Sequence, residues 1–393
     1  MKIKDVRSTV VTVPFNKTRL WALGCQKGTT RTIVEIATDE GIIGVGETIG
    51  VTNDTIDRRI KPLLLGEDPT NILRLTEKAK WATPWGAVNT PGSVPVAAIE
   101  MALWDIKGKA TSRPVCDLLG GKFRDRLKFI NVIQYAVASE EEFSEQNAVD
   151  AILREIDETT RKYGSDIIQL YVAVFSPQKD IEIVRGIREK FGSNLRIGID
   201  VNRTWSPETA IRTLNALQSC SLDYVEDATA EIGALGRVRS SVSVPFSTHY
   251  NNVYEIAKTR AADIIAGDIH ECGGFLGTKK LISQCEGLNL GFWFHSSNEL
   301  GISLTAMLHC IASSPHIVHP SQTIAGWLTD DIITKPHKFR NGMIELPDGP
   351  GLGIDIDYQK LEKYAAVFKE RGEMSPHDLD SRRAGWFPQL SGI

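Results

Sequence analysis

The chain has 393 residues, of which 42% are hydrophobic, and its 45 Lys and Arg residues nearly balance 49 Asp and Glu residues. This composition is typical of a folded globular protein with one large domain or two, and it excludes a disordered or fibrous chain. The sequence has no basic block suited to nucleic acid, no apolar run near the roughly 18 residues of a membrane span, and no signal-peptide pattern at its start. We therefore expect a cytoplasmic protein with a small-molecule partner, and neither a nucleic acid nor a membrane as a partner.

The first 125 residues predict a domain that combines an antiparallel sheet with helices. Apolar and polar residues alternate over 31–37 and again over 42–48, and turn-forming residues lie between these two runs. This pattern indicates a β-hairpin. Farther along, the apolar spacing becomes helical, most clearly over 94–110, so the N-terminal unit is predicted to be α+β.

From about residue 126 the pattern changes to short apolar runs that alternate with helical segments. The predicted strands are 128–136, 167–174, 196–201, 223–226, 244–248, 263–268, 291–295 and 316–319. Eight such strands predict an α/β fold with a closed (β/α) barrel, and an open doubly wound sheet is the alternative. No glycine-rich nucleotide-binding motif supports that alternative. We divide the chain into 1–125, a barrel over 126–325, and a segment over 326–393 that packs back on the first domain.

Polar side chains follow several predicted barrel strands where each strand ends. Asp200, Glu226 and His249 end three successive strands, and Asp268 and His295 end the next two. The carboxyl ends of barrel strands meet at one mouth, so the first three residues predict a metal site. An Asp beside a His fixes the imidazole tautomer and raises its basicity, which predicts a general base. A single Asp at such a position is more often a helix cap, but five polar residues at successive strand ends favour a functional site over a set of caps.

Several of these motifs resemble a known family. The run over 98–110, followed by Leu118-Leu119-Gly120-Gly121, resembles the end of the capping domain in the mandelate racemase and muconate lactonizing enzyme branch of the enolase superfamily. Three patterns resemble the glucarate dehydratase group within it: Asp200-x-Asn202, Glu226-Asp227, and Asp268 with His295-Ser296-x-Asn298. The resemblance covers nearly the whole chain. It implies a modified TIM barrel, an N-terminal α+β capping domain completed by the C-terminal tail, and a homo-oligomer.

The resemblance also implies roles for individual residues. Asp200 and Glu226 would be metal ligands, with His249 at the position of the third ligand, and Asp268 and His295 would be the catalytic pair. Substrate contacts would come from Gln169, Asn202 and Asn298. The family uses Mg²⁺ to stabilise the ene-diolate that forms when a base removes the proton α to a carboxylate.

The sequence departs from the family pattern on the second barrel strand. The family has Lys-x-Lys there, whereas this chain has Gln169-Leu170-Tyr171. Gln169 cannot titrate, and Tyr171 could serve as a catalytic base only if its phenol were strongly activated. The alternative is that Tyr171 packs or contacts substrate. Racemisation needs bases on both faces of the carbanion, so this departure disfavours it.

The second departure is His249, because the family places an oxygen ligand at that position. An imidazole shifts metal preference from Mg²⁺ toward Mn²⁺, Fe²⁺, Ni²⁺ or Zn²⁺, although Mg²⁺ stays the expectation from the family. The alternative is that His249 contacts substrate instead of the metal.

The leading functional prediction is a lyase, a metal-dependent dehydratase of an acid sugar. A racemase, epimerase or cycloisomerase of the same superfamily is the first alternative. A ligand-binding or catalytically decayed homologue is the second, because both strand-two lysines are missing.

Two aromatic, glycine-containing segments, 21–25 and 85–89, either close over substrate or make domain contacts. We interpret His270 and His309 as structural and His319 as a candidate for the barrel mouth.

Overall fold

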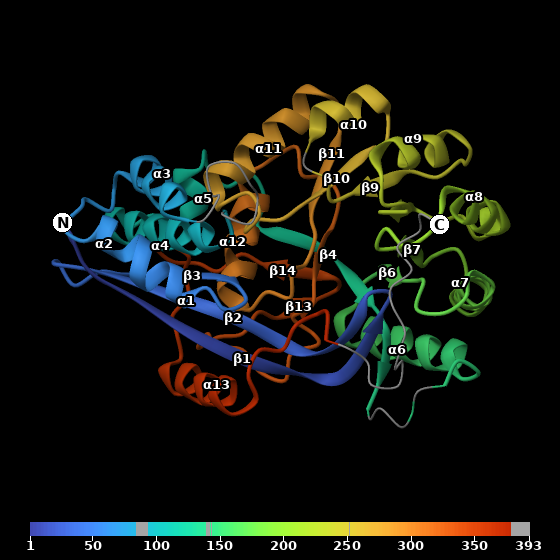
Figure 1. Cartoon of the computed structure of the whole chain (residues 1–393), viewed down its shortest axis with the longest axis horizontal. Helices are drawn as coiled ribbons and strands as arrows, with labels where there is room; N and C mark the ends of the chain where they lie inside the picture. Colours follow the sequence, from blue (N-terminus) through green and yellow to red (C-terminus); the bar gives the residue numbers. More distant parts are fainter. Residues whose placement is uncertain (84–92, 139–141, 143, 251, 379–393) are drawn as a thin grey trace.

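The computed structural model describes residues 1–83, 93–138, 142, 144–250 and 252–378. The predicted segment 85–89 lies outside them. Within the described residues, a long antiparallel hairpin and a group of helices lie against a parallel barrel (Figure 1). No helix in this part of the chain is long and apolar enough to cross a membrane.

The capping domain is built on a four-stranded antiparallel sheet with the strand order β3-β2-β1-β5. Its strands are β1 (Ile3–Trp21), β2 (Gly24–Thr38), β3 (Ile43–Ile49) and β5 (Tyr135–Val137). Its helical segments are α1 (Asn53–Thr55), η1 (Ile56–Ile60), α2 (Lys61–Leu64), α3 (Ile72–Ala82), α4 (Ser93–Thr111) and α5 (Val115–Leu118). The predicted α+β character of the N-terminal unit is confirmed. Of the predicted loop at 21–25, only Ala22 and Leu23 form the turn of the β1–β2 hairpin, because β1 ends at Trp21 and β2 begins at Gly24.

Helix α4 lies very close to strand β3. A methyl group on Gly44 or Gly46 would overlap the backbone carbonyl oxygens of Ala102 or Ala98 in α4. Glycine therefore permits a contact between strand and helix that any larger side chain would prevent. The close contact fixes β3, which carries Glu47 toward the barrel.

The barrel contains eight parallel strands among the residues that the structure describes. They are β4 (Arg126–Ile133), β6 (Ile167–Tyr171), β7 (Arg196–Asp200), β8 (Tyr224–Glu226), β9 (Phe246–Thr248), β10 (Ile264–Gly267), β11 (Gly291–Phe294) and β12 (Ser321–Thr323). Strands β4 to β11 pair in chain order, and β12 pairs with β4. A bond from the Phe294 amide to Ser321 Oγ, at 3.1 Å, links the last two strands. The barrel prediction is confirmed over the open-sheet alternative.

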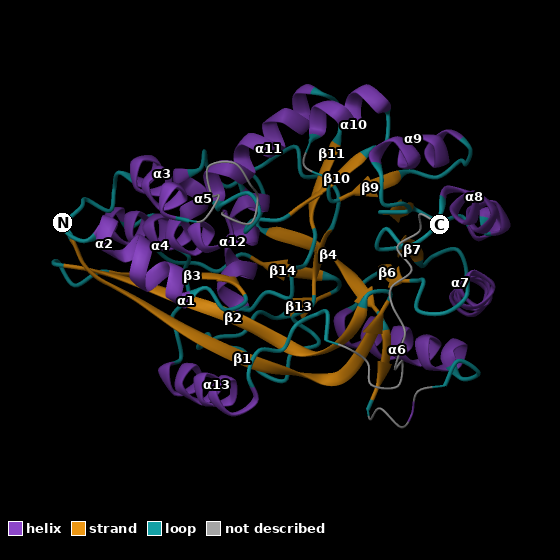
Figure 2. Ribbon diagram, viewed as in Figure 1, coloured by secondary structure: helices purple, strands orange, loops and turns teal. Residues whose placement is uncertain are grey.

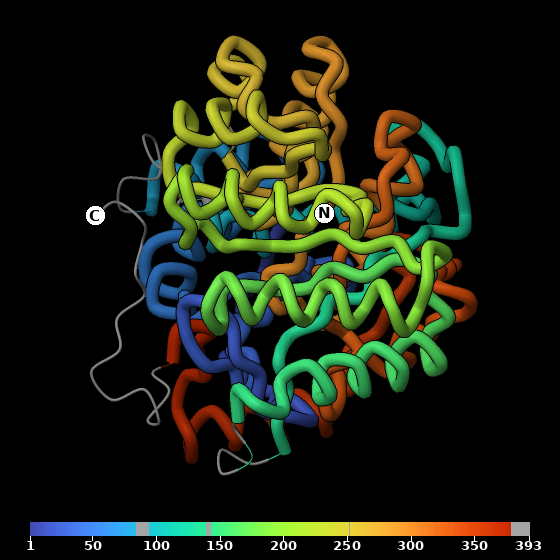
Figure 3. The backbone as a smooth tube through the Cα atoms, turned by 90° about the vertical axis from the view of Figure 1, so that its right-hand side faces the viewer, coloured from blue at the N-terminus to red at the C-terminus, as the bar shows by residue number. Residues whose placement is uncertain are grey.

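Helices connect successive barrel strands and cover the outside of the barrel (Figure 2). They are α6 (Ala148–Tyr163), α7 (Pro177–Phe191), α8 (Pro207–Ala216), α9 (Ile232–Ser240), α10 (Val253–Thr259), α11 (Phe275–Gly287) and α12 (Gly301–Ala312), with a short turn, η4 (Gln218–Cys220), after α8. Neighbouring helices from α6 to α10 contact one another, and they lie side by side in Figure 3. This arrangement leaves the strand ends to carry functional side chains.

Two predicted strands differ from the structure. The prediction 128–136 merges two strands, because β4 ends at Ile133 and Tyr135 begins β5, which pairs with β1 in the capping sheet. The prediction 316–319 is wrong, because the eighth strand is β12. Val318 is 72% exposed, and the carbonyl of Ile317 accepts a hydrogen bond from Arg124, so this apolar stretch is a connection and not a strand.

The C-terminal segment contacts both parts of the molecule. It contains β13 (Phe339–Arg340), β14 (Met343–Glu345) and α13 (Tyr358–Arg371). Strand β14 pairs with β4, and α13 packs against β1. The amide of Cys25 donates to the carbonyl of Asp378 at 2.9 Å, so the chain beyond α13 runs along the hairpin tip. The division at residues 125 and 325 stays a prediction.

Buried His309 joins α12 to two other segments and predicts a loss of stability in acid. Its Nδ1 accepts the Cys116 amide and its Nε2 donates to the Leu352 carbonyl, each at 3.1 Å, so the native ring is neutral. Burial lowers the pKa of His309 from 6.5 to about 4. Between these values the unfolded chain binds a proton that the native chain does not, so the free energy of unfolding should fall by up to about 3 kcal/mol as the pH drops from 6.5 to 4.

Chemical unfolding at pH 7.5, 5.5 and 4.5 measures this loss. His309→Leu should be less stable than the parent at pH 7.5 but should lose less stability on acidification. An equal loss of stability in parent and variant would assign the pH dependence to other groups. His337 is one such group, because burial lowers its pKa to about 4 as well.

Candidate active site

The structure brings Asp268 and His295 together at the ends of two adjacent strands. Gly267 and Phe294 pair in register on β10 and β11, so the residues that follow them are neighbours. Asp268 Oδ2 lies 3.1 Å from His295 Nε2. Burial alone would lower the pKa of His295, but the hydrogen bond and charge of Asp268 outweigh burial and raise it. This pair can therefore accept a proton and stabilise the resulting imidazolium.

Asp200 and Glu226 form an acidic pair on the neighbouring strands β7 and β8, where they are direct partners in the strand register. Both are fully buried. Burial and neighbouring carboxylates raise the pKa of Asp200 to about 7, and burial together with the charge of Asp200 raises the pKa of Glu226 well above its usual value. A nearby cation would relieve this repulsion.

His249 completes the acidic side of the mouth. Its Nδ1 lies 2.8 Å from Asp227 Oδ2, and its Nε2 lies 3.3 Å from Glu226 Oε1. Burial and the nearby charge of His295 lower the pKa of His249 despite the opposing effect of Asp227. Its ring centroid is 4.2 Å from that of His295, so the acidic side and the catalytic pair touch.

Oxygen and nitrogen atoms of these side chains are suitable ligands for a divalent cation. Asp227 accepts a hydrogen bond from the Nδ1–H group of His249, which leaves the Nε2 lone pair facing Glu226 Oε1, a buried atom without a hydrogen-bond partner. A carboxylate that holds the far nitrogen is the usual support for a metal-ligating imidazole. Within the described ranges, however, no three His, Cys, Asp or Glu side chains converge as a ligand group. Asp200 is instead bonded to Asn202.

The predicted substrate contacts lie near the mouth, and most of their polar groups already have protein partners. Asn202 donates from its amide and its Nδ2 to Asp200, each at 2.8 Å. Gln169 donates to Asp200 at 3.4 Å and accepts from Tyr224 and Gln322, each at 2.6 Å. These two residues therefore hold the acidic pair in place.

Asn298 and Tyr171 face the capping domain. The carbonyl of Asn298 accepts from Thr29 Oγ1 at 2.7 Å, and its Nδ2 is 3.5 Å from Gln26 Oε1. The ring of Tyr171 lies 6.3 Å from that of Trp21 at the tip of the β1–β2 hairpin. Burial, followed by the charges of Asp200 and Glu226, raises the pKa of Tyr171 well above 10. The hairpin therefore reaches over the end of β6.

Sequence reasoning missed several residues of the site. Asp227 was visible directly after Glu226 but received no role. Gln322 was missed because the eighth strand was placed too early, yet it bonds Gln169 and lies 3.3 Å from Glu226 Oε2. His270, interpreted as structural, lies 3.0 Å from Asp268 Oδ1. His319 does not reach the mouth, because its ring packs near Gly291 at the opposite end of β11.

Comparison with known families agrees with this fold. Residues 151–360 match the family described as enolase C-terminal domain-like, and residues 6–120 match the N-terminal domain of mandelate racemase and muconate lactonizing enzyme. The fold and these matches together define the class of protein, which is a barrel enzyme that carries a capping domain. The chain belongs to the enolase superfamily, in its mandelate racemase and muconate lactonizing enzyme branch.

Several relatives are similar over most of their length. A probable glucarate dehydratase from Streptomyces coelicolor is 31% identical over 86% of this chain and 84% of its own. The chloromuconate cycloisomerase CbnB from Cupriavidus necator is 25% identical over 93% of this chain and 99% of its own. The crystal structure of an enolase from Thermobispora bispora, complexed with magnesium and formate, covers 98% of this chain and 97% of its own. Its sequence is 30% identical, and the TM-score is 0.89. Enzymes with different reactions thus share this architecture.

Proposed function

We propose that this protein is a divalent-metal-dependent dehydratase of an acid sugar. The observation that carries the proposal is the contact between the Asp268–His295 pair and the acidic group of Asp200, Glu226 and His249 at one barrel mouth. A base and a set of metal ligands in contact are what removal of a proton α to a carboxylate requires. The similarity to a probable glucarate dehydratase supports the same reaction class.

Asp200, Glu226 and His249 would hold the metal, and Mg²⁺ is the ion we expect, with Mn²⁺ as an alternative because of the imidazole. The similar enolase that was complexed with magnesium supports this choice. When bound, the metal supplies positive charge that stabilises the ene-diolate. Glu226 Oε1, which has no hydrogen-bond partner, and the neighbouring His249 Nε2 would be two of the atoms that hold the ion.

His295 carries out the proton transfer in this proposal. Because its Nε2 faces Asp268, Nδ1 is the nitrogen that takes the α-proton, and the buried Asp268 carboxylate stabilises the imidazolium. The C–H electron pair first forms the double bond of the ene-diolate. It then forms the Cα–Cβ double bond of the enol as the bond to the β-hydroxyl breaks. The proton held by His295 is then available to the departing hydroxyl, which leaves as water. The enol tautomerises to a 2-keto acid.

An isomerase is the second candidate, favoured by the similarity to a chloromuconate cycloisomerase. A racemase is less suited, because the residues at the end of β6 are Gln169 and Tyr171. Gln169 cannot titrate, and its side chain is already bonded to Tyr224 and Gln322. We therefore favour chemistry on one face of the carbanion.

A screen of aldonic and aldaric acids for 2-keto acid formation, with Mg²⁺ and then with Mn²⁺, tests the proposed function. We expect one acid or a small set of acids to give a keto acid. Interconversion of epimers without loss of water would favour the isomerase. Binding of an acid with neither reaction would favour a binding protein.

The variant Tyr171→Phe should lower turnover only modestly, by less than about tenfold. Its phenol lies against the hairpin tip, and burial opposes its ionisation, so we expect a contact role. Steady-state kinetics with the acid found in the screen measures the effect. A loss of at least about a hundredfold would show that the phenol acts as an acid or base, because such groups contribute ~10²–10⁴.

A further inference from the structure

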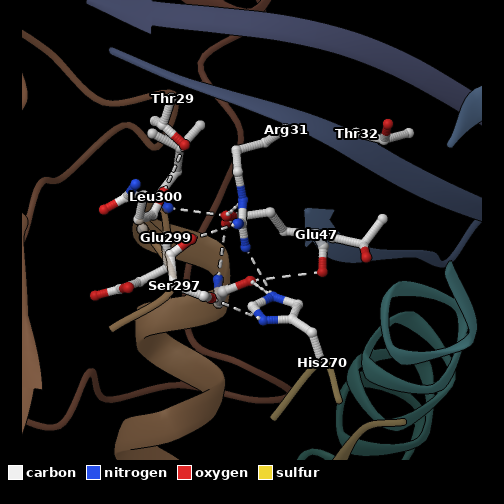
Figure 4. Close-up of polar contacts among 12 residues, drawn as sticks. Thr29, Arg31, Thr32, Glu47, His270, Ser297, Glu299 and Leu300 are labelled. Carbon is white, nitrogen blue, oxygen red and sulfur yellow. Dashed lines mark hydrogen bonds and ion pairs between the residues drawn. The ribbon is translucent and has the colours of Figure 1, made fainter. Parts of the chain in front are cut away.

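Two side chains of the capping domain, Arg31 and Glu47, point toward His270 and the start of α12 (Figure 4). Arg31 lies on β2 and Glu47 on β3, and both side chains are completely buried. Arg31 Nε donates to Glu47 Oε1 at 2.8 Å. Glu47 thus balances the charge of Arg31, while the other guanidinium nitrogens point at barrel residues.

Arg31 contacts the Asp268 side of the catalytic pair through His270. Arg31 Nη2 lies 2.8 Å from His270 Nε2, and His270 Nδ1 lies 3.0 Å from Asp268 Oδ1. A guanidinium can only donate, so His270 Nε2 accepts and the ring proton lies on Nδ1, directed at Asp268. Asp268 uses its other oxygen for His295. A continuous chain of contacts thus runs from the capping domain to the catalytic base.

The same two capping-domain residues also hold the segment that follows His295. Arg31 Nη1 donates to the carbonyl of Ser297 at 2.9 Å. Glu47 accepts the amides of Leu300 and Ser303, at 2.8 and 2.9 Å, in the first turn of α12. A carboxylate at a helix N-terminus pairs with its free N–H groups and its dipole. Both ends of the connection from His295 to α12 are therefore anchored to the capping domain.

We propose that Arg31, acting through His270 and through the connection after His295, is a positioning residue for the Asp268–His295 pair. This inference rests on the proposed function, in which the capping domain would set the orientation of the base His295. Arg31, His270 and Asp268 are buried, and their contacts rely on a fixed guanidinium geometry, which few other side chains reproduce. Misplacement of a catalytic group by about 1 Å can cost ~100-fold in rate.

Kinetics of Arg31→Gln and His270→Gln test the proposal, with Arg19→Gln as a matched control. Arg19 is equally buried on the capping sheet and pairs with Glu155 of α6 at 3.0 Å, away from the catalytic pair. We expect kcat to fall about 10- to 100-fold in the two test variants with KM changed less than about threefold, and kcat to change less than threefold in the control. His270→Asn keeps a donor near the Nδ1 position but is too short to reach Arg31, so its kcat should fall as in His270→Gln.

Equal losses of kcat in Arg31→Gln and Arg19→Gln, or parent-like kcat in His270→Asn, would overturn the positioning role through His270. The His270 variants leave the Arg31–Glu47 ion pair intact, so they decide the question if Arg31→Gln does not fold.

A second measurement needs no substrate and separates this inference from the proposed function. Nitrogen NMR of histidine-labelled protein should show a neutral His270 with the proton on Nδ1. The His295 ring signals should shift in Arg31→Gln and stay unchanged in Arg19→Gln. Unshifted His295 signals in Arg31→Gln would overturn the inference even if the enzyme is active. Shifted signals would support it even if no acid in the screen reacts.

Discussion

Replacing His295 by Asn should abolish α-hydrogen exchange and turnover together, which is the largest kinetic effect that we expect. In the proposed mechanism His295, beside Asp268, is the general base, and removal of such a group costs ~10²–10⁴ in rate. In D₂O the parent protein should exchange the α-hydrogen of only one epimer of a substrate or substrate analogue. Proton NMR of the acid follows both the exchange and the loss of water.

Two results would contradict this single-base prediction. Exchange that persists in His295→Asn would assign proton removal to another residue. Exchange of both epimers by the parent protein would show a base on each face and would favour the racemase or epimerase. Metal affinity measured on His295→Asn serves as the control that the barrel mouth is otherwise intact.

Replacing Glu226 by Gln should weaken divalent-cation binding by at least about 100-fold, because the change would remove a proposed ligand and its charge while it preserves the shape of the side chain. Loss of a residue that only supports a ligand already costs 10- to 100-fold. Calorimetric titration with Mg²⁺ and Mn²⁺ measures the affinity, and circular dichroism checks the fold.

Glu299→Gln is the matched control for this variant. Glu299 is also buried and has an unpartnered Oε1, but its Oε2 accepts from Ser296 Oγ at 2.6 Å. Its replacement should leave the affinity within about threefold of the parent. Unchanged affinity in Glu226→Gln would remove Glu226 from the ligand set. In a crystal structure with Mn²⁺, a His249 nitrogen well beyond ~2.5 Å from the ion would remove His249 as well.

The strand-end residues could be located from the sequence because the barrel repeats a local pattern. Each βα unit contributes a short apolar strand that ends at a polar residue, and the parallel register brings those ends to one mouth. Asp200 and Glu226 are register partners, and Asp268 and His295 follow register partners. The missed Gln322 shows the limit, since Ile317 and Val318 resemble a strand but only connect α12 to β12.

The sequence by itself determined the α+β start, the barrel and the five strand-end residues, because alternation, helical spacing and backbone pairing are local properties of the chain. Only the tertiary structure decided which groups support them. Arg31 and His270 are 239 residues apart in the chain, and their contact depends on how the capping sheet packs on the barrel. Docking of one domain on another is set by the shape and polarity of whole surfaces, and no local pattern of residues encodes it.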